Sequence, residues 1–151
     1  MSNGLETSSA AHGPVVAHRF LLAVLHSPLG RMFGGLCELR FVGRISERTI
    51  SLPVQYVREG TRLVVYVSHA SDKRWWRNFI DGLSVQVHVA GLSCQGHGHV
   101  VGAGHPDRAW AERTYHRHHP RVELLPTAPM VVIGIGAGEA EGITRDRSKD
   151  E

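Results

Sequence analysis

One short segment of this chain alternates strictly between apolar and polar side chains. The apolar positions are Leu83, Val85, Val87 and Val89, and the polar positions between them are Ser84, Gln86 and His88. Successive side chains of a β-strand point to opposite faces, so this period of two predicts a strand with one face in a core and the other toward solvent. Strands of this kind are typical of antiparallel sheets, because parallel sheets are covered on both faces.

Five further segments have the character of strands. They are residues 37–42, 50–56, 63–67, 93–102 and 130–135. The continuous apolar run from Leu63 to Val67 predicts a strand that is buried on both faces. Pro53 has no N–H group to donate to a neighbour, which predicts that its strand lies at an edge or contains a bulge. Turn signals such as Glu59-Gly60 separate the segments.

Other segments have helical character. Between Pro14 and Leu25 the apolar residues recur at helical spacing, which predicts an N-terminal helix. A second helix is expected after Asp107 and before Pro120, and the segment WWRNF, Trp75 to Phe79, suggests a short helical turn. The pattern therefore predicts an α+β fold: a six-stranded antiparallel β-barrel with an N-terminal helix and two or three further short helices.

A length of 151 residues favours a single domain. Residues 1–13 are small and polar and residues 137–151 form a charged tail, so we expect both to be disordered around a folded domain at 14–136. Lysine and arginine outnumber aspartate and glutamate by 17 to 14, and acidic residues gather in the tail. A basic domain fits an anionic ligand, nucleic acid or an anionic membrane, and also an ordinary solvated surface. Without a helix-turn-helix signal, we expect no nucleic-acid partner.

Cysteine content and apolar runs predict the compartment. Two cysteines are too few for a disulfide framework. The apolar run from Phe20 to Leu25 is too short to span a membrane. We therefore expect a cytoplasmic protein, and the N-terminal helix leaves a weak membrane-surface contact as an open alternative.

Two motifs carry most of the functional information. The first is GRISER, Gly43 to Arg48, followed five residues later by Pro53-Val54, and the second is WWRNF. Together they resemble the deazaflavin-dependent nitroreductase-like family, flavin split barrels related to the pyridoxamine-phosphate-oxidase-like proteins. In that family the first motif reads G-R-K-[ST]-G-[KR] and the second reads W-[WY]-x-N-[LF]. Two positions depart from the pattern, since Ile45 replaces a lysine and Glu47 replaces a glycine.

The resemblance implies a split β-barrel that forms a homodimer and binds the deazaflavin coenzyme F-420, with FMN as the alternative. The cofactor-site residues that it implies are Arg44, Ser46, Arg48, Pro53, Ser68, His69, Ser71, Lys73, Trp75 and Asn78. Two basic side chains at a turn suit the anionic, phosphate-bearing tail of such a cofactor. Ile45 removes one cation and Glu47 adds an anion there, which weakens the expected binding. Trp75 and Phe79 share one helix face, so packing into the barrel is an alternative role for Trp75.

The histidines raise the question of a metal site. His97 and His99 are two residues apart and share one face of a strand. Three more histidines, His116, His118 and His119, end a predicted helix. Imidazole is a common metal ligand, but no HExxH motif or cysteine pair accompanies these residues, so we assign no metal ligands.

These observations lead to a hypothesis for the function. Reduced coenzyme F-420 would transfer a hydride to a small electrophilic substrate, such as a nitro compound, a quinone or an activated alkene. The protein would supply binding, orientation and exclusion of water. His69 or Tyr115 would stabilise charge on the substrate, although Tyr115 is equally suited to packing. The alternative is a non-catalytic barrel that binds a flavin or another small ligand.

Overall fold

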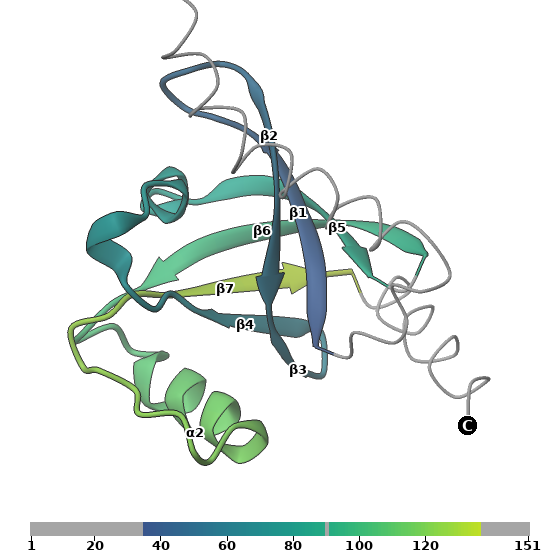
Figure 1. Ribbon diagram of the computed structural model, residues 1–151. Helices are drawn as coiled ribbons and strands as arrows, with labels where there is room; N and C mark the ends of the chain where they lie inside the picture. The colour runs from purple at the N-terminus through teal and green to yellow at the C-terminus, as the bar shows by residue number, and fades with distance from the viewer. Residues whose placement is uncertain (1–34, 90, 137–151) are drawn as a thin grey trace, which may run out of the picture.

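A computed structural model describes residues 35–89 and 91–136 (Figure 1). The strands are β1 (Leu36–Val42), β2 (Thr49–Gln55), β3 (Val57–Glu59), β4 (Arg62–Tyr66), β5 (Leu83–Val89), β6 (Leu92–Val101) and β7 (Met130–Ile135). The helices are η2 (Ala70–Asp72) and η3 (Trp75–Phe79), both of the 3-10 type, and α2 (Arg108–His118). The predicted N-terminal helix, the segment 1–13 and the tail 137–151 lie outside the described residues.

The seven strands form one antiparallel sheet in the order β2-β1-β5-β6-β7-β4-β3. β2 and β3 stand at its two edges, yet Tyr56 alone separates them in the sequence. The two edges therefore meet at this point, and the sheet has to curl into a half-barrel. Figure 1 shows the result, with β1 and β2 crossing the direction of β4 and β7. Pro53 lies in β2, so its predicted place on an edge strand is confirmed.

The sheet has seven strands where the sequence predicted six. The predicted strand 50–56 ends at Gln55, and Val57–Glu59 forms a separate strand that pairs with β4. At the break, the N–H group of Tyr56 donates to the carbonyl of Gly35 at 2.7 Å. The alternation of apolar side chains ends at the break, because Tyr56 and Val57 are adjacent apolar residues. Val54 accordingly belongs to one core cluster and Val57 to the other.

The described residues contain one α-helix, which is fewer helices than predicted. This helix, α2, begins and ends where the sequence indicated, between Asp107 and Pro120. WWRNF forms a 3-10 helix instead, a conformation that is common in short pieces. Within the described part of the chain, no helix is long and apolar enough to span a membrane.

Buried side chains form two clusters on opposite faces of the sheet. The inner core lies inside the curl and includes Val85, Val87 and Val89, which confirms the predicted half-buried strand β5. The outer core lies between α2 and the other face of β3, β4 and β7. In β4, Leu63 belongs to the inner core and Val64 to the outer core. The prediction of a strand buried on both faces is therefore confirmed.

Phe79 anchors η3 to the inner core. Its side chain is fully buried and packs edge-on against Phe41, with ring centroids 4.9 Å apart, and against Trp75 at 6.1 Å. Burying such a ring contributes about 2–3 kcal/mol to stability. The ring lies over Gly98 of β6, where an added Cβ atom would approach a ring carbon to 2.7 Å. Only glycine at this position leaves room for Phe79.

Arg108 joins three segments at the start of α2. Its buried guanidinium donates hydrogen bonds to the carbonyls of Val101 at 3.0 Å, Ala128 at 2.7 Å and Leu125 at 3.1 Å. Its Nε atom also donates to the carboxylate of Glu112 at 2.7 Å. The end of β6, helix α2 and the segment before β7 are thereby held together.

We predict that Arg108→Met lowers the free energy of unfolding by about 3 kcal/mol, because it leaves buried carbonyl groups without donors. Urea denaturation measures the effect. The control is Arg113→Met, which removes an exposed arginine of the same helix and should change stability by less than about 0.5 kcal/mol. Equal losses in the two variants would contradict this role for Arg108.

Candidate functional site

The GRISER turn joins β1 to β2 and is closed by backbone hydrogen bonds. The N–H group of Gly43 donates to the carbonyl of Arg48 at 2.9 Å, and that of Glu47 donates to the carbonyl of Gly43 at 3.0 Å. The hydroxyl of Ser46 accepts the N–H group of Arg48 at 3.3 Å. Residues 44–48 are all exposed, and Ile45 has 97% of its surface accessible. The turn therefore holds a defined shape while it presents its side chains to solvent.

Glu47 adopts a backbone conformation that glycine prefers. Its φ angle is 55°, in the left-handed region, where a Cβ atom crowds the following carbonyl. This is the position at which the turn departs from the G-R-K-[ST]-G-[KR] pattern. The departure therefore keeps the conformation of the turn but adds strain and a negative charge.

Asn78 links the turn to η3. Its side-chain oxygen accepts the backbone N–H group of Arg44 at 2.9 Å, and its side-chain nitrogen donates to the carbonyl of Trp75 at 2.9 Å. The two motifs lie 34 residues apart in the sequence. One amide side chain thus brings both motifs of the sequence analysis to the same place.

Arg44 and Arg48 differ in their surroundings. The guanidinium of Arg44 lies 2.7 Å from the carboxylate of Asp81, and both side chains are well exposed, at 44% and 71%. The ion pairs among the described residues do not include Arg48. Of the two arginines in the turn, Arg48 is therefore the more available for an external anion.

A polar loop follows β4 and is fastened to η3. The indole N–H group of Trp76 donates to the carbonyls of Ala70 at 3.2 Å and Lys73 at 3.0 Å. The ammonium group of Lys73 lies 3.4 Å from the hydroxyl of Ser68. His69, like Glu47, has a left-handed backbone, with φ 52°. Turn, loop and η3 are therefore one connected unit.

The remaining predicted residues differ in their relation to this unit. Ser71 lies in η2, where it is exposed, and Trp75 is half-buried against the inner core. Pro53 faces away from that core, because its neighbours Leu52 and Val54 both belong to it. Tyr115 lies apart from the unit, in the outer core.

Tyr115 packs between two rings. Its ring centroid is 5.7 Å from that of Tyr66 and 4.9 Å from that of His119, and only 4% of its surface is exposed. Burial raises the pKa of its hydroxyl, with a smaller effect from Tyr66. Tyr115 is thus a neutral packing residue in this structure.

One cluster of polar side chains, His99, His105 and Asp107, was not predicted from the sequence. His97 and His99 share a strand face as expected, but His97 lies against Gly82, where an added Cβ atom would be 2.7 Å from its Nε2 atom. His99 lies beside His105 instead, with ring centroids 5.6 Å apart. Partial burial, and next to it His105, lower the pKa of His99, which favours the neutral form of its ring. The signal available in the sequence was His105-Pro106-Asp107, close after the glycine-rich strand.

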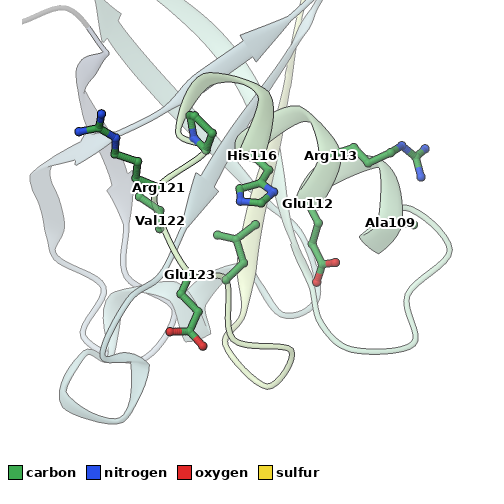
Figure 2. A pocket seen from close by; sticks show the side chains of 9 residues that line it. Ala109, Glu112, Arg113, His116, Arg121, Val122 and Glu123 are labelled. Carbon is green, nitrogen blue, oxygen red and sulfur yellow. The ribbon is translucent and has the colours of Figure 1, made fainter.

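An open groove of about 700 Å³ lies between α2 and the segment that follows it (Figure 2). Arg113, His116 and Arg121 line it together with Glu112 and Glu123. In Figure 1, α2 and the β1–β2 turn lie at opposite ends of the domain. The groove is therefore separate from the unit formed by the turn, the loop and η3. Acidic and basic side chains both line it, so its charge favours no particular ligand.

Comparisons with known proteins give matches of low similarity. No protein-family model and no curated protein match this sequence. The FAD and heme binding protein from Mycobacterium smegmatis matches with a TM-score of 0.47 and 14% identity over 68% of this chain and 62% of that one, so the match spans less than two thirds of its length. An F-420-H2 dependent reductase matches with a TM-score of 0.47 and 15% identity over 66% and 94%.

A further structure, described as a domain-swapped dimer, matches with a TM-score of 0.45 and 15% identity over 66% of this chain and 80% of that one. The neighbours include proteins of the flavin split-barrel kind that the resemblance named. The TM-scores of these three structures lie below 0.5, so their likeness carries no evidence about the site.

We predict that Glu47→Gly raises the free energy of unfolding by about 0.5–1 kcal/mol. Relief of left-handed strain contributes about 1–2 kcal/mol, and the greater freedom of glycine in the unfolded chain offsets about half of it. Urea denaturation measures the change. Ile45→Gly, at a neighbouring position without a positive φ angle, should lower stability instead. A loss of stability in Glu47→Gly would contradict the conformation described for the turn.

Proposed function

We propose that this chain is an oxidoreductase that binds coenzyme F-420 and reduces a small electrophile, such as a nitro compound, a quinone or an activated alkene. The reduced deazaflavin supplies a hydride when it is bound, and the protein supplies binding, orientation and exclusion of water. The observation that carries the proposal is the double hydrogen bond of Asn78, which joins the GRISER turn to η3. Two motifs that suggested one cofactor site in the sequence are neighbours in space.

The side chains present fit an anionic, phosphate-bearing group. Arg48 and Lys73 supply positive charge, and the hydroxyls of Ser46 and Ser68 supply hydrogen bonds. In the proposed site these four residues bind the tail of the cofactor. Arg44 joins them only when it leaves Asp81, because an ion pair already uses its charge.

The polar loop is proposed to bind the ring. Ser68 and Ser71 are small, so the backbone of the loop can approach a flat ligand closely. Trp75 belongs to η3, the helix to which the loop is hydrogen-bonded. His69 is exposed and Tyr115 is buried in the outer core, so the proposal assigns to His69 the donor that stabilises charge on the substrate. The roles of Pro53 and Tyr115 in this proposal are structural.

A non-catalytic ligand-binding barrel is the second candidate. The Arg44–Asp81 pair favours it, because it reduces the charge that the turn offers to an anionic tail. Ile45 and Glu47 act in the same direction. A barrel that binds a flavin weakly and transfers no hydride would have these features.

A homodimer is part of the proposal. Among the described strands, β2 pairs only with β1, and β3 pairs only with β4, so each leaves one edge open. Open strand edges are usually covered in soluble proteins. The cytoplasmic location and the weak membrane-surface contact remain predictions from the sequence.

We predict that coenzyme F-420 binds more tightly than FMN and quenches tryptophan fluorescence. Trp75 and Trp76 belong to the proposed site, whereas Trp110 lies in α2. Quenching should therefore persist in Trp110→Phe and decrease in Trp75→Phe. Tighter binding of FMN, or no binding of either compound, would contradict the proposed cofactor. Oxidation of the reduced coenzyme in the presence of a nitroaromatic compound would distinguish an enzyme from a binding protein.

We predict that Asp81→Asn tightens the binding of coenzyme F-420 by about two- to fivefold at low salt. The change frees Arg44, and exposed ion pairs contribute about 0.2–1 kcal/mol. Titration by tryptophan quenching measures the affinity, and 0.5 M salt should remove most of the gain. Glu123→Gln is the matched control, because it changes the net charge equally but lies in the groove beside α2. An equal gain in the control would place the anionic tail elsewhere.

A further inference from the structure

Three side chains that commonly bind metal ions meet where β6 leads into α2. They are His99 on β6 and His105 and Asp107 in front of the helix, all half-buried. One ligand atom from each lies within 4.8 Å of the ligand atoms of the other two. None of these residues belongs to the turn, loop and η3 unit, so the cluster requires its own explanation.

The fold holds this cluster in a defined arrangement. His99 is two residues before Val101, an outer-core residue, so its side chain faces the same side of the sheet as α2. The short connection to the helix is fixed by two backbone bonds, from His105 to the carbonyl of Gly102 at 3.2 Å and from Arg108 to the carbonyl of His105 at 3.0 Å. Arg108 also ties the helix to Val101 through its guanidinium. Strand and helix start are therefore positioned before any ligand arrives.

We propose that His99, His105 and Asp107 bind a divalent first-row transition-metal ion such as Zn²⁺. Two imidazoles and one carboxylate form a ligand set that suits zinc and related ions. Bond lengths of about 2.0–2.2 Å place such ligand atoms about 3.3 Å apart around a tetrahedral ion, so side-chain rotations suffice to close the present spacing. Three protein ligands leave at least one coordination position for water or an added ligand.

Two contacts of the cluster compete with the ion. Nδ1 of His105 accepts the backbone N–H group of Asp107 at 3.0 Å, and His105 has to exchange this bond for the ion. The guanidinium of Arg62 lies 3.9 Å from the carboxylate of Asp107 and stacks on Trp110 at 3.5 Å. A fixed cation so close to the ion lowers the affinity. The proposal therefore implies that Arg62 weakens metal binding, and that binding tightens once Arg62 is neutralised.

His97 provides a matched control for the ligands. It is the same residue type on the same strand and the same face, two positions from His99. Its ring lies against the backbone of Gly82 and is absent from the cluster. Replacing it removes one histidine from the protein without removing a proposed ligand.

The test uses the untagged full chain, treated with a chelator and titrated with Zn²⁺ by calorimetry and with Co²⁺ by visible absorption. We expect one equivalent to bind and the Co²⁺ spectrum to show d–d bands of a nitrogen- and oxygen-ligated ion. His99→Gln, His105→Gln and Asp107→Asn should each weaken binding at least tenfold. His97→Gln and the helix-end variant His116→Gln should leave it unchanged, and Arg62→Gln should tighten it several-fold.

The outcomes separate the proposed site from binding by scattered histidines. No stoichiometric binding by the wild-type chain at 100 μM metal would overturn the proposal, as would equal losses in His97→Gln and in the three ligand variants. Circular dichroism checks that each variant is folded. If a ligand variant unfolds, the effect of Arg62→Gln decides, because unchanged affinity in that variant would exclude Asp107 as a ligand.

Discussion

The architecture depends on one covalent constraint. β2 and β3 lie at opposite edges of the sheet but are consecutive in the chain, with Tyr56 alone between them. A flat sheet of seven strands spaced by about 4.8 Å would separate its edges by almost 30 Å, far beyond the reach of one residue. The sheet therefore curls, and the curl encloses the inner core. It also leaves the outer face of β4 and β7 free to receive α2.

Most of the local structure was predictable from side-chain periodicity. The alternation in β5 and the continuous apolar run in β4 correctly indicated one buried face and two buried faces, respectively. The adjacent apolar residues Tyr56 and Val57 end the alternation of β2, but the hydrogen bond of Tyr56 was not predictable, because its acceptor is the carbonyl of Gly35 in a distant segment. The same holds for Arg108, since a basic residue in a first helical turn reads as a surface residue until the carbonyls around it are known.

The residues of the candidate site were predictable from the two motifs, but most of the contacts between their side chains were not. The two motifs indicated which residues to examine, and their proximity through Asn78 agrees with that reading. The sequence could not reveal the ion pair between Asp81 and Arg44. Which exposed charges pair depends on their positions in the folded structure and not on their separation in the sequence. The histidine pair was predicted on the correct strand face, but the neighbour of His99 is His105, which a turn brings back from beyond the end of the strand. Long-range pairing of polar side chains has no periodic signature.

The contact between Gly98 and Phe79 links the interior of the barrel to its surface. Phe79 rests directly on a glycine of β6, and on the same short helix Asn78 holds the backbone of Arg44. Because position 98 has no side chain, Phe79 lies directly on β6, and this contact sets the distance between η3 and the strand. A larger residue there would lift the helix, and the displacement would pass through one amide group to the basic turn. A glycine inside the fold therefore helps to determine the shape of a turn on the surface.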